Sequence, residues 1–251
     1  MRYPNSSFPV PLIHLTEADS TSRYLTALCE QNRLEEFTVV LSDFQTAGRG
    51  QQDNIWEAEK GKNLLFSFVL YPSFLEARNQ FLLSQIIALS VKEELGEWAS
   101  GFSVKWANDI YWENKKICGI LIENDLTGSR IERSIVGIGL NINQKEFHSS
   151  APNPVSLTQI TGNRYDLLSL LGRLMERCTR YYELLRQGEK DIIAERYRQS
   201  LFWKEGLHPY ADKHGKFIAR IIRVKPGGTL VLEDESGRER EYAFKEVAHI
   251  I

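Results

Sequence analysis

Cysteine is scarce in this sequence, and its three cysteines form no recognisable pattern. Cys29, Cys118 and Cys178 are far apart, odd in number and without the spacing of a Cys/His metal site. The five histidines are equally scattered, at His14, His148, His208, His214 and His249. We therefore expect neither a disulfide framework nor a metal centre built from these side chains, and a reducing compartment suits such a protein best.

Long apolar runs are missing as well. No segment approaches the roughly 20 apolar residues of a membrane-spanning helix. The first 14 residues contain three prolines and one arginine but no apolar core of a signal peptide. The formal net charge of -2 excludes a global basic field that would attract nucleic acid phosphates. We expect a cytoplasmic protein that binds neither membranes nor DNA.

The first 200 residues predict an α+β domain. Short apolar or β-branched runs at 13–15, 38–42 and 64–71 are typical of strands. The polar residues at 19–22 are typical of a helix start and predict a helix to about residue 30. Residues 82–95 carry apolar side chains at helical spacing and predict a buried helix. Four more short strands are expected at 102–106, 110–112, 117–123 and 134–143. Because turn residues separate these four runs, they should form antiparallel hairpins.

The last 50 residues predict a separate small module. Helical patterns over 164–185 and 191–200 close the first domain. After them come short strand-like runs, divided by a Lys-Pro-Gly-Gly turn and a Glu-Ser-Gly turn, at 217–224, 229–232 and 241–244. The chain of 251 residues therefore divides into a domain at 1–200 and a small β-barrel-like module at 201–251.

One loop combines glycines, an arginine and a tryptophan, in the segment QTAGRGQQDNIW at 45–56. Glycines let the main chain approach an anion closely, and Arg49 can bind one through two parallel hydrogen bonds. Trp56 offers a face on which a base can stack. Taken alone, the Gly-Arg-Gly triplet is more often a surface turn, and it matches neither a Walker loop nor a dinucleotide fingerprint.

A second polar group lies between predicted strands, in VKWANDI at 104–110 and KKICGILIE at 115–123. A hairpin would bring Asp109 and Lys116 together at one end of the sheet. There the lysine could neutralise a phosphate, and the aspartate could position Mg²⁺ or the lysine itself. The alternative is an exposed ion pair worth ~0 to 1 kcal/mol, and without further motifs that alternative would be preferred.

Five motifs in this order resemble the catalytic domain of biotin protein ligases. They are DSTS at 19–22, AGRG at 47–50 with Trp56, KWAND at 105–109, Lys116 with Gly119, and GIGLN at 137–141. The resemblance covers nearly the whole chain and includes the small C-terminal module. It implies a class II synthetase-like α+β domain with a mainly antiparallel sheet, followed by an SH3-like barrel. The dozen residues before the first strand are too few for the helix-turn-helix domain of family members that act as repressors.

The resemblance also implies the chemistry. In that family the biotin carboxylate attacks the α-phosphate of MgATP, which gives biotinyl-5'-AMP and pyrophosphate. The mixed anhydride then acylates a lysine on a biotin carboxyl carrier domain of a carboxylase. We expect the carrier to dock by strand addition to an exposed sheet edge. The same mode would support a homodimer, and the sequence leaves both monomer and homodimer open.

The expected biotin-binding residues follow from the same resemblance. They are Ser20, Thr21, Ser22, Gln45, Arg49, Gly50, Gln51, Lys116 and Gly119. Among them, Ser20, Thr21 and Gln45 would hydrogen-bond the ureido ring or line its pocket. The segment Arg49–Gly50 would hold the carboxyl end of biotin and the α-phosphate.

Nucleotide contacts and catalysis are assigned in the same way. The residues expected at ATP or the adenylate are Arg49, Trp56, Asn108, Lys116 and Asn141, and the expected catalytic residues are Lys116, Arg49 and Asp109. Lys116 would lie between the carboxylate and the α-phosphate and stabilise the charge of the transition state. Trp56 would pack against adenine and Asn141 would contact the nucleotide. Mg²⁺ would arrive with ATP, and Asp109 is the candidate to position it.

The sequence departs from the family pattern in two places. Many members carry further arginines after Gly-Arg-Gly, whereas this chain has Gln51, Asp53 and Asn54. We hypothesise that it therefore retains biotinyl-5'-AMP less tightly. Ala107 replaces the usual proline, which removes a fixed φ angle but no polar group, and we expect activity to survive.

Two other functions fit the same residues. A lipoate- or octanoate-attaching enzyme of the same superfamily would share the fold, although the AGRG block, the KWAND block and the C-terminal module favour biotin. A non-catalytic biotin-binding protein would keep the pocket alone. The presence of both Lys116 and Asp109 favours an enzyme over a simple binding protein.

Overall fold

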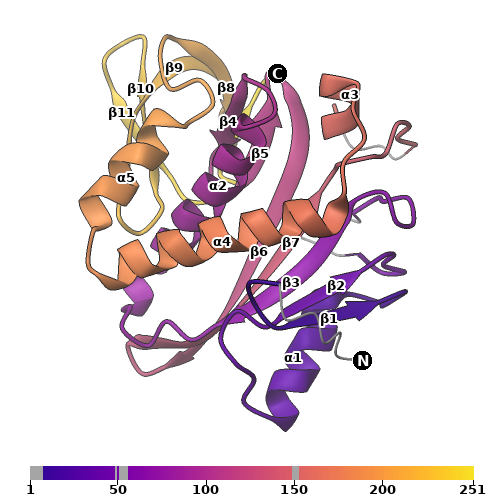
Figure 1. The fold of residues 1–251 in the computed structure, drawn as a ribbon. Coiled ribbons are helices and arrows are strands. Elements are labelled where there is room, and N and C mark those ends of the chain that lie inside the picture. Colours follow the sequence, from indigo (N-terminus) through magenta and orange to yellow (C-terminus); the bar gives the residue numbers. More distant parts are fainter. Residues whose placement is uncertain (1–7, 49, 51–55, 149–152) are drawn as a thin grey trace.

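The computed structural model describes residues 8–48, 50, 56–148 and 153–251, which form two β-sheets with helices packed around the larger one (Figure 1). The larger sheet has seven strands in the order β1-β2-β3-β7-β6-β5-β4. Its strands are β1 (Leu12–Leu15), β2 (Val39–Ser42), β3 (Leu64–Leu70), β4 (Phe102–Lys105), β5 (Asp109–Trp112), β6 (Lys115–Thr127) and β7 (Arg130–Leu140). Strands β1 and β2 are parallel, and every other neighbouring pair is antiparallel.

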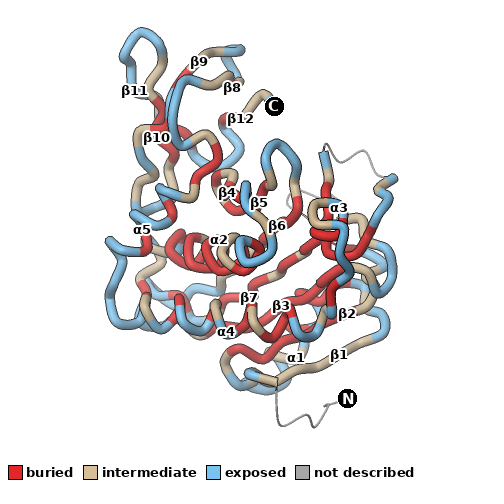
Figure 2. Tube along the Cα trace, turned by 45° about the horizontal axis from the view of Figure 1, so that its top comes forward, coloured by how far each residue is buried: buried red, intermediate tan, exposed pale blue. Residues whose placement is uncertain are grey.

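Helices cover both faces of this sheet. The helices are α1 (Thr21–Gln31), α2 (Phe81–Gly96), α3 (Leu157–Thr161), α4 (Leu167–Arg186) and α5 (Lys190–Gln199), with a 3-10 turn at Ala77–Asn79. On one face, α2 and α4 pack on the sheet and form the main core with it. On the other face, Leu25 of α1 packs against Val40, Val69 and Ile135 of β2, β3 and β7. All of β3 is therefore buried (Figure 2).

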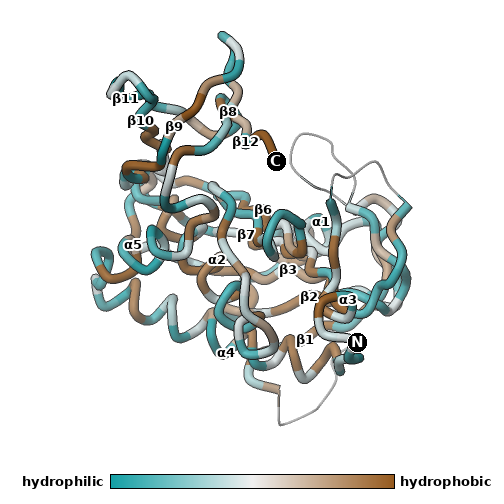
Figure 3. Tube along the Cα trace, turned by 90° about the horizontal axis from the view of Figure 1, so that it is seen from above, coloured by the Kyte–Doolittle hydropathy of each residue, from teal (hydrophilic) through white to brown (hydrophobic). Residues whose placement is uncertain are grey.

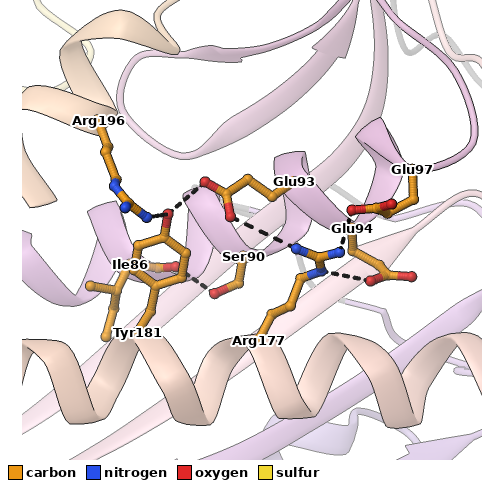
Figure 4. A network of polar contacts seen from close by, with 8 residues as sticks. All are labelled: Ile86, Ser90, Glu93, Glu94, Glu97, Arg177, Tyr181 and Arg196. Carbon is orange, nitrogen blue, oxygen red and sulfur yellow. Dashed lines mark hydrogen bonds and ion pairs between the residues drawn. The ribbon is translucent and has the colours of Figure 1, made fainter.

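The contact between α2 and the later helices is built from charged groups as well as apolar ones (Figure 4). Glu94 is only 1% exposed, and its two carboxylate oxygens accept hydrogen bonds of 2.8 Å from Arg173 and Arg177. Tyr181 of α4 donates to Glu93 of α2 at 2.6 Å. Because a buried charge is costly unless it is paired, these partners allow α2 to carry carboxylates on a covered surface.

The second sheet is antiparallel and has the strand order β11-β10-β9-β8-β12. Its strands are β8 (His208–Asp212), β9 (Gly215–Val224), β10 (Leu230–Asp234), β11 (Glu239–Tyr242) and β12 (Val247–His249). Figure 3 shows it at one side of the larger sheet. Trp106, just after β4, donates a 3.0 Å hydrogen bond to the Gly228 carbonyl, and its ring packs edge-on against Phe244. This sheet therefore lies against the end of the large sheet that carries β4 and β5.

The prediction of an α+β fold with a mainly antiparallel sheet is confirmed, and a second sheet at the C-terminus is consistent with a small module. The division at residue 200 stays a prediction. Two strands and one helix were not predicted: β8 contains Pro209, β12 has three residues, and α3 has five. For α3, the capping box of Ser156 and Gln159 was an available signal. In the described part of the chain, no helix is long and apolar enough to cross a membrane.

Candidate active site

A pocket of hydroxyl groups lies where α1 begins. Ser20 is the N-cap residue of α1, and Thr21 and Ser22 form its first turn, all three buried. Gln45 follows β2, which runs parallel to β1, so the segments after both strands emerge at the same edge. There the Gln45 side-chain oxygen accepts from the Thr21 backbone N–H at 2.7 Å and from the Thr21 hydroxyl at 3.1 Å. The structure thus brings together four of the residues expected at biotin.

A fifth polar residue in this pocket, Ser67, was missed in the sequence. It lies at the middle of β3 and is fully buried. Its Oγ is 2.8 Å from the Thr21 hydroxyl and 3.0 Å from the Ser22 hydroxyl. The only local signal was a lone serine in the apolar run LLFSFVL. Its partners come from a helix 45 residues earlier, so the contact depends on the tertiary fold.

The predicted hairpin of β5 and β6 brings the second polar group together. Lys116 Nζ lies 2.7 Å from Asp109 Oδ2, and both side chains are about one-third exposed, at 31% and 30%. Asp109 pairs in register with Gly119, and a bulge between Ile110 and Tyr111 sets the position of Lys116. The pair is therefore held on rigid strands and still open to a ligand.

Two glycines separate the Lys116 pair from the hydroxyl pocket. Gly119 of β6 and Gly139 of β7 are direct cross-strand partners. The Trp56 indole lies on both: a Cβ on Gly139 would come within 2.5 Å of the ring, and one on Gly119 within 2.9 Å. Lys116 Nζ is 5.8 Å from the centre of the same ring. Any larger residue at these positions would displace the indole.

Both asparagines expected at the nucleotide are buried. Asn108 donates to the Ile120 carbonyl and so ties the turn before β5 to β6. Asn141 donates to the Val155 carbonyl at 3.2 Å, while its side-chain oxygen has no partner among the described residues. Trp56 Nε1 is likewise buried without a partner there. Unpaired buried polar atoms cost stability, and a ligand that supplied a donor for Asn141 and an acceptor for Trp56 would recover it.

A second lysine, Lys105, borders the Asp109–Lys116 pair and was not assigned a role from the sequence. It pairs with Asp109 in the register of β4 and β5, and its Nζ is 3.2 Å from the Tyr111 hydroxyl. Burial lowers the pKa of Lys105; the Asp109 carboxylate opposes this shift, and the Lys116 charge adds to it. Burial also raises the pKa of the Cys118 thiol, which lies in the core.

Several predicted residues lie outside the described part of the chain, namely Arg49, Gln51, Asp53 and Asn54. Gly50 is described and is partly buried. Within the described residues, no group of three or more His, Cys, Asp or Glu side chains could hold a metal ion. Asp109 offers one carboxylate, which suits a Mg²⁺ ion held mainly by phosphates and water and not a dedicated protein cage.

Comparisons of the sequence and of the fold with known proteins point to one family. Residues 15–141, half of the chain, match the model of the Biotin/lipoate A/B protein ligase family. The chain is 29% identical over 246 residues to the Bifunctional ligase/repressor BirA of Bacillus subtilis, covering 92% of this chain and 72% of that protein. It is 28% identical to the Biotin--[acetyl-CoA-carboxylase] ligase of Paracoccus denitrificans, covering 80% of this chain and 85% of that protein. A similar solved structure is the biotin protein ligase from Aquifex aeolicus in complex with biotin and ATP, with a TM-score of 0.79, 28% identity, and coverage of 94% and 97% of the two chains.

Proposed function

Because the chain belongs to the biotin/lipoate A/B protein ligase family, we propose that it is a biotin protein ligase. It activates biotin with ATP to form biotinyl-5'-AMP and transfers the biotinyl group to a lysine of a carrier domain. The observation that carries this proposal is a row of groups with two different ends, which would line one groove once the Trp56 indole moves aside. Hydroxyls and an amide lie at one end, the Lys116–Asp109 pair lies at the other, and Gly119 and Gly139 form the floor between them.

The hydroxyl end suits the ureido ring of biotin. A cyclic urea carries two N–H donors beside one carbonyl acceptor. Thr21, Ser22 and Gln45 supply hydroxyl and amide groups within one hydrogen-bonded cluster. Ser20 is buried next to them at the N-cap of α1. The apolar chain of biotin would then cross the glycine floor, in the space that the Trp56 indole fills.

The charged end suits adenylation. The biotin carboxylate and the α-phosphate repel one another, and the Lys116 ammonium between them would reduce that repulsion. As the carboxylate oxygen bonds to the α-phosphorus and pyrophosphate leaves, negative charge grows on the phosphoryl oxygens that face Lys116. Asp109 holds the ammonium in place at 2.7 Å. Mg²⁺ would neutralise the phosphates of ATP, with Asp109 as the candidate carboxylate for it, and Arg49 and Gln51 stay predicted contacts of the substrates.

In the second step, the amine of the acceptor lysine attacks the biotinyl carbonyl and AMP leaves. An ammonium must first lose its proton, and either water or Asp109 can take it. Asp109 is already paired with Lys116, so we assign it positioning before base catalysis. Asn108 ties the turn before β5 to β6, and Asn141 ties the end of β7 to Val155 and keeps its side-chain oxygen for the nucleotide. Displacement of Trp56 from the groove would free its indole to pack against adenine.

The partner of the transfer step is a biotin carboxyl carrier domain that docks by strand addition. The edge strands of the larger sheet are β1 and β4. Leu201 bridges the outer side of β4, whereas no described strand pairs with the outer side of β1. We therefore place the carrier at β1, next to the hydroxyl pocket. Slower hydrogen exchange at Leu12–Leu15 with the carrier present would support this, and unchanged exchange there would exclude it.

The domain division and the compartment also belong to this proposal. Residues 1–200 form the catalytic domain and residues 201–251 the small β-module. The three cysteines of the chain are free, and Cys118 and Cys178 are buried, which suits the reducing cytoplasm. Monomer and homodimer both remain compatible with the β1 edge.

Lipoate is the second candidate substrate, since the matching family includes lipoate enzymes. The test is to incubate the purified protein with MgATP and either biotin, lipoate or octanoate. Pyrophosphate release and the mass of the acyl-AMP are then measured. We expect biotinyl-AMP alone. Formation of lipoyl-AMP would assign the other substrate class, and biotin binding with no adenylate would indicate a non-catalytic binding protein.

A further inference from the structure

A fully buried serine in the centre of an apolar strand needs an explanation. Ser67 is 0% exposed on β3, where its neighbours on the strand are leucine, phenylalanine and valine. The strand opposite leaves room for its hydroxyl, because a Cβ on the facing residue, Gly137, would come within 2.7 Å of Ser22 Oγ and 3.5 Å of Ser67 Oγ. The missing side chain at Gly137 thus leaves space for the hydroxyls of Ser22 and Ser67.

The direction of this chain follows from the number of protons on each group. The Thr21 backbone N–H can only donate, so the Gln45 atom it meets at 2.7 Å must be the carbonyl oxygen. That oxygen can only accept, so the Thr21 hydroxyl donates its one proton to it. At the 2.8 Å contact between Thr21 and Ser67, Ser67 must therefore be the donor. Its own proton is then used, so Ser22 must donate to Ser67 at 3.0 Å.

We propose that Ser67 is a positioning residue that orients the hydroxyls of the biotin pocket for a cyclic urea. With the chain running from Ser22 through Ser67 and Thr21 to Gln45, the Thr21 and Ser22 hydroxyls keep only lone pairs for a ligand. The Gln45 oxygen is engaged twice, which leaves its amide N–H groups as donors. Acceptors for two N–H groups and a donor for one carbonyl match a urea. This inference rests on the proposed function.

Removal of the Ser67 hydroxyl would undo this orientation. In Ser67→Ala the Ser22 hydroxyl loses its acceptor, so its proton can turn toward the ligand. A proton there opposes a ureido N–H, because two donors cannot bond to one another. The variant should therefore bind biotin more weakly. It should also discriminate less between biotin and an analogue that lacks one ureido N–H.

The test compares biotin with a biotin analogue methylated on one ureido nitrogen, using calorimetry on wild type and Ser67→Ala. We expect biotin to bind the variant roughly tenfold more weakly, with KM for ATP unchanged. The preference for biotin over the N-methyl analogue should fall by a similar factor. Ser90→Ala is the matched control, since Ser90 is also 0% exposed and donates to the Ile86 carbonyl at 2.7 Å on α2 (Figure 4).

Ser22→Ala provides a second variant, because it removes the acceptor itself and leaves β3 unchanged. We expect it to lose discrimination against the N-methyl analogue at least as strongly as Ser67→Ala, even if the latter is less stable. Equal weakening of biotin and the N-methyl analogue by Ser67→Ala, or no weakening at all, would overturn the inference while wild type still binds biotin. Failure of wild type to bind biotin would instead overturn the proposed function.

Discussion

Two charged clusters of the protein use a paired carboxylate in opposite ways. On α2, Glu94 is 1% exposed, and both of its oxygens are taken by Arg173 and Arg177. In the groove, Lys116 and Asp109 are each about 30% exposed, and among the described residues Asp109 is the one carboxylate at ion-pair distance from Lys116. The ammonium therefore keeps N–H donors that Asp109 does not use. The Glu94 cluster, whose carboxylate is fully paired, holds the helices together. The Lys116–Asp109 pair is incomplete, because its ammonium can still bind a substrate.

The largest expected effect comes from breaking the incomplete pair. Lys116→Met should reduce biotinyl-AMP formation by roughly 100- to 1000-fold, because the charge that stabilises the transition state is gone. The unfolding free energy should change by no more than about 1 kcal/mol, since the pair is partly solvated. Pyrophosphate release and thermal melting measure the two quantities. Lys115→Met, at the exposed neighbouring position, is the control and should leave both unchanged.

The Glu94 cluster should show the opposite pattern, a loss of stability with normal activity. Glu94→Gln leaves two arginines short of a charged partner, and we expect a loss of about 2–3 kcal/mol of unfolding free energy. This is less than for a fully buried pair, because Arg173 is 42% exposed. Adenylation by the folded variant should be normal. Urea unfolding measures the loss, and Glu97→Gln, which changes an exposed partner of Arg177, is the matched control. A variant that loses adenylation at wild-type stability would contradict the division between the two clusters.

A third prediction concerns the glycine floor. Gly139→Ala places a methyl group 2.5 Å from the Trp56 ring and in the path of the biotin chain. We expect biotin to bind roughly tenfold more weakly, with a change in tryptophan fluorescence as the indole moves. Gly96→Ala, where nothing lies within 4 Å, should leave both readings unchanged. Unaltered biotin affinity in Gly139→Ala would place the ligand elsewhere.

The smallest effect concerns the second sheet at low pH. Burial, together with the nearby charges of Lys105 and His208, lowers the pKa of His249 to about 3. The unfolded chain takes up this proton below about pH 6.5 while the folded protein does not, so stability falls as the pH drops from 6.5 toward 3.

At pH 5.8 this single group should destabilise the fold by about 1 kcal/mol relative to pH 8. His249→Phe should remove that part of the pH dependence. Unfolding curves of wild type and variant at the two pH values measure the difference. The exposed His214, replaced by Gln, should behave as wild type. Parallel pH dependence in His249→Phe and wild type would show that His249 is not the group responsible.

Much of the fold could be predicted because its signals are local. Strand β3 is a continuous apolar run, α2 has helical spacing, and the turn residues between β5 and β6 predict the hairpin that joins Asp109 to Lys116. Strand β8 escaped prediction because it includes Pro209 and polar residues, and β12 because three residues hold too little pattern.

The missed parts of the site depend on contacts between distant segments. The role of Ser67 can be recognised only when α1 places Thr21 and Ser22 beside β3. The fit of Trp56 over Gly119 and Gly139 likewise depends on the pairing of β6 with β7. The resemblance to biotin protein ligases indicated all of these residues except Ser67 by their motifs, but spacing alone could not predict the contacts between them.

A crystal structure with bound biotin would show whether the ligand extends from the hydroxyl pocket over the glycines to Lys116. We expect the ureido ring between Thr21 and Gln45, the carboxylate facing Lys116, and the Trp56 indole moved from Gly119 and Gly139. Biotin bound away from these residues, or bound with the indole still on the glycines, would contradict this expectation.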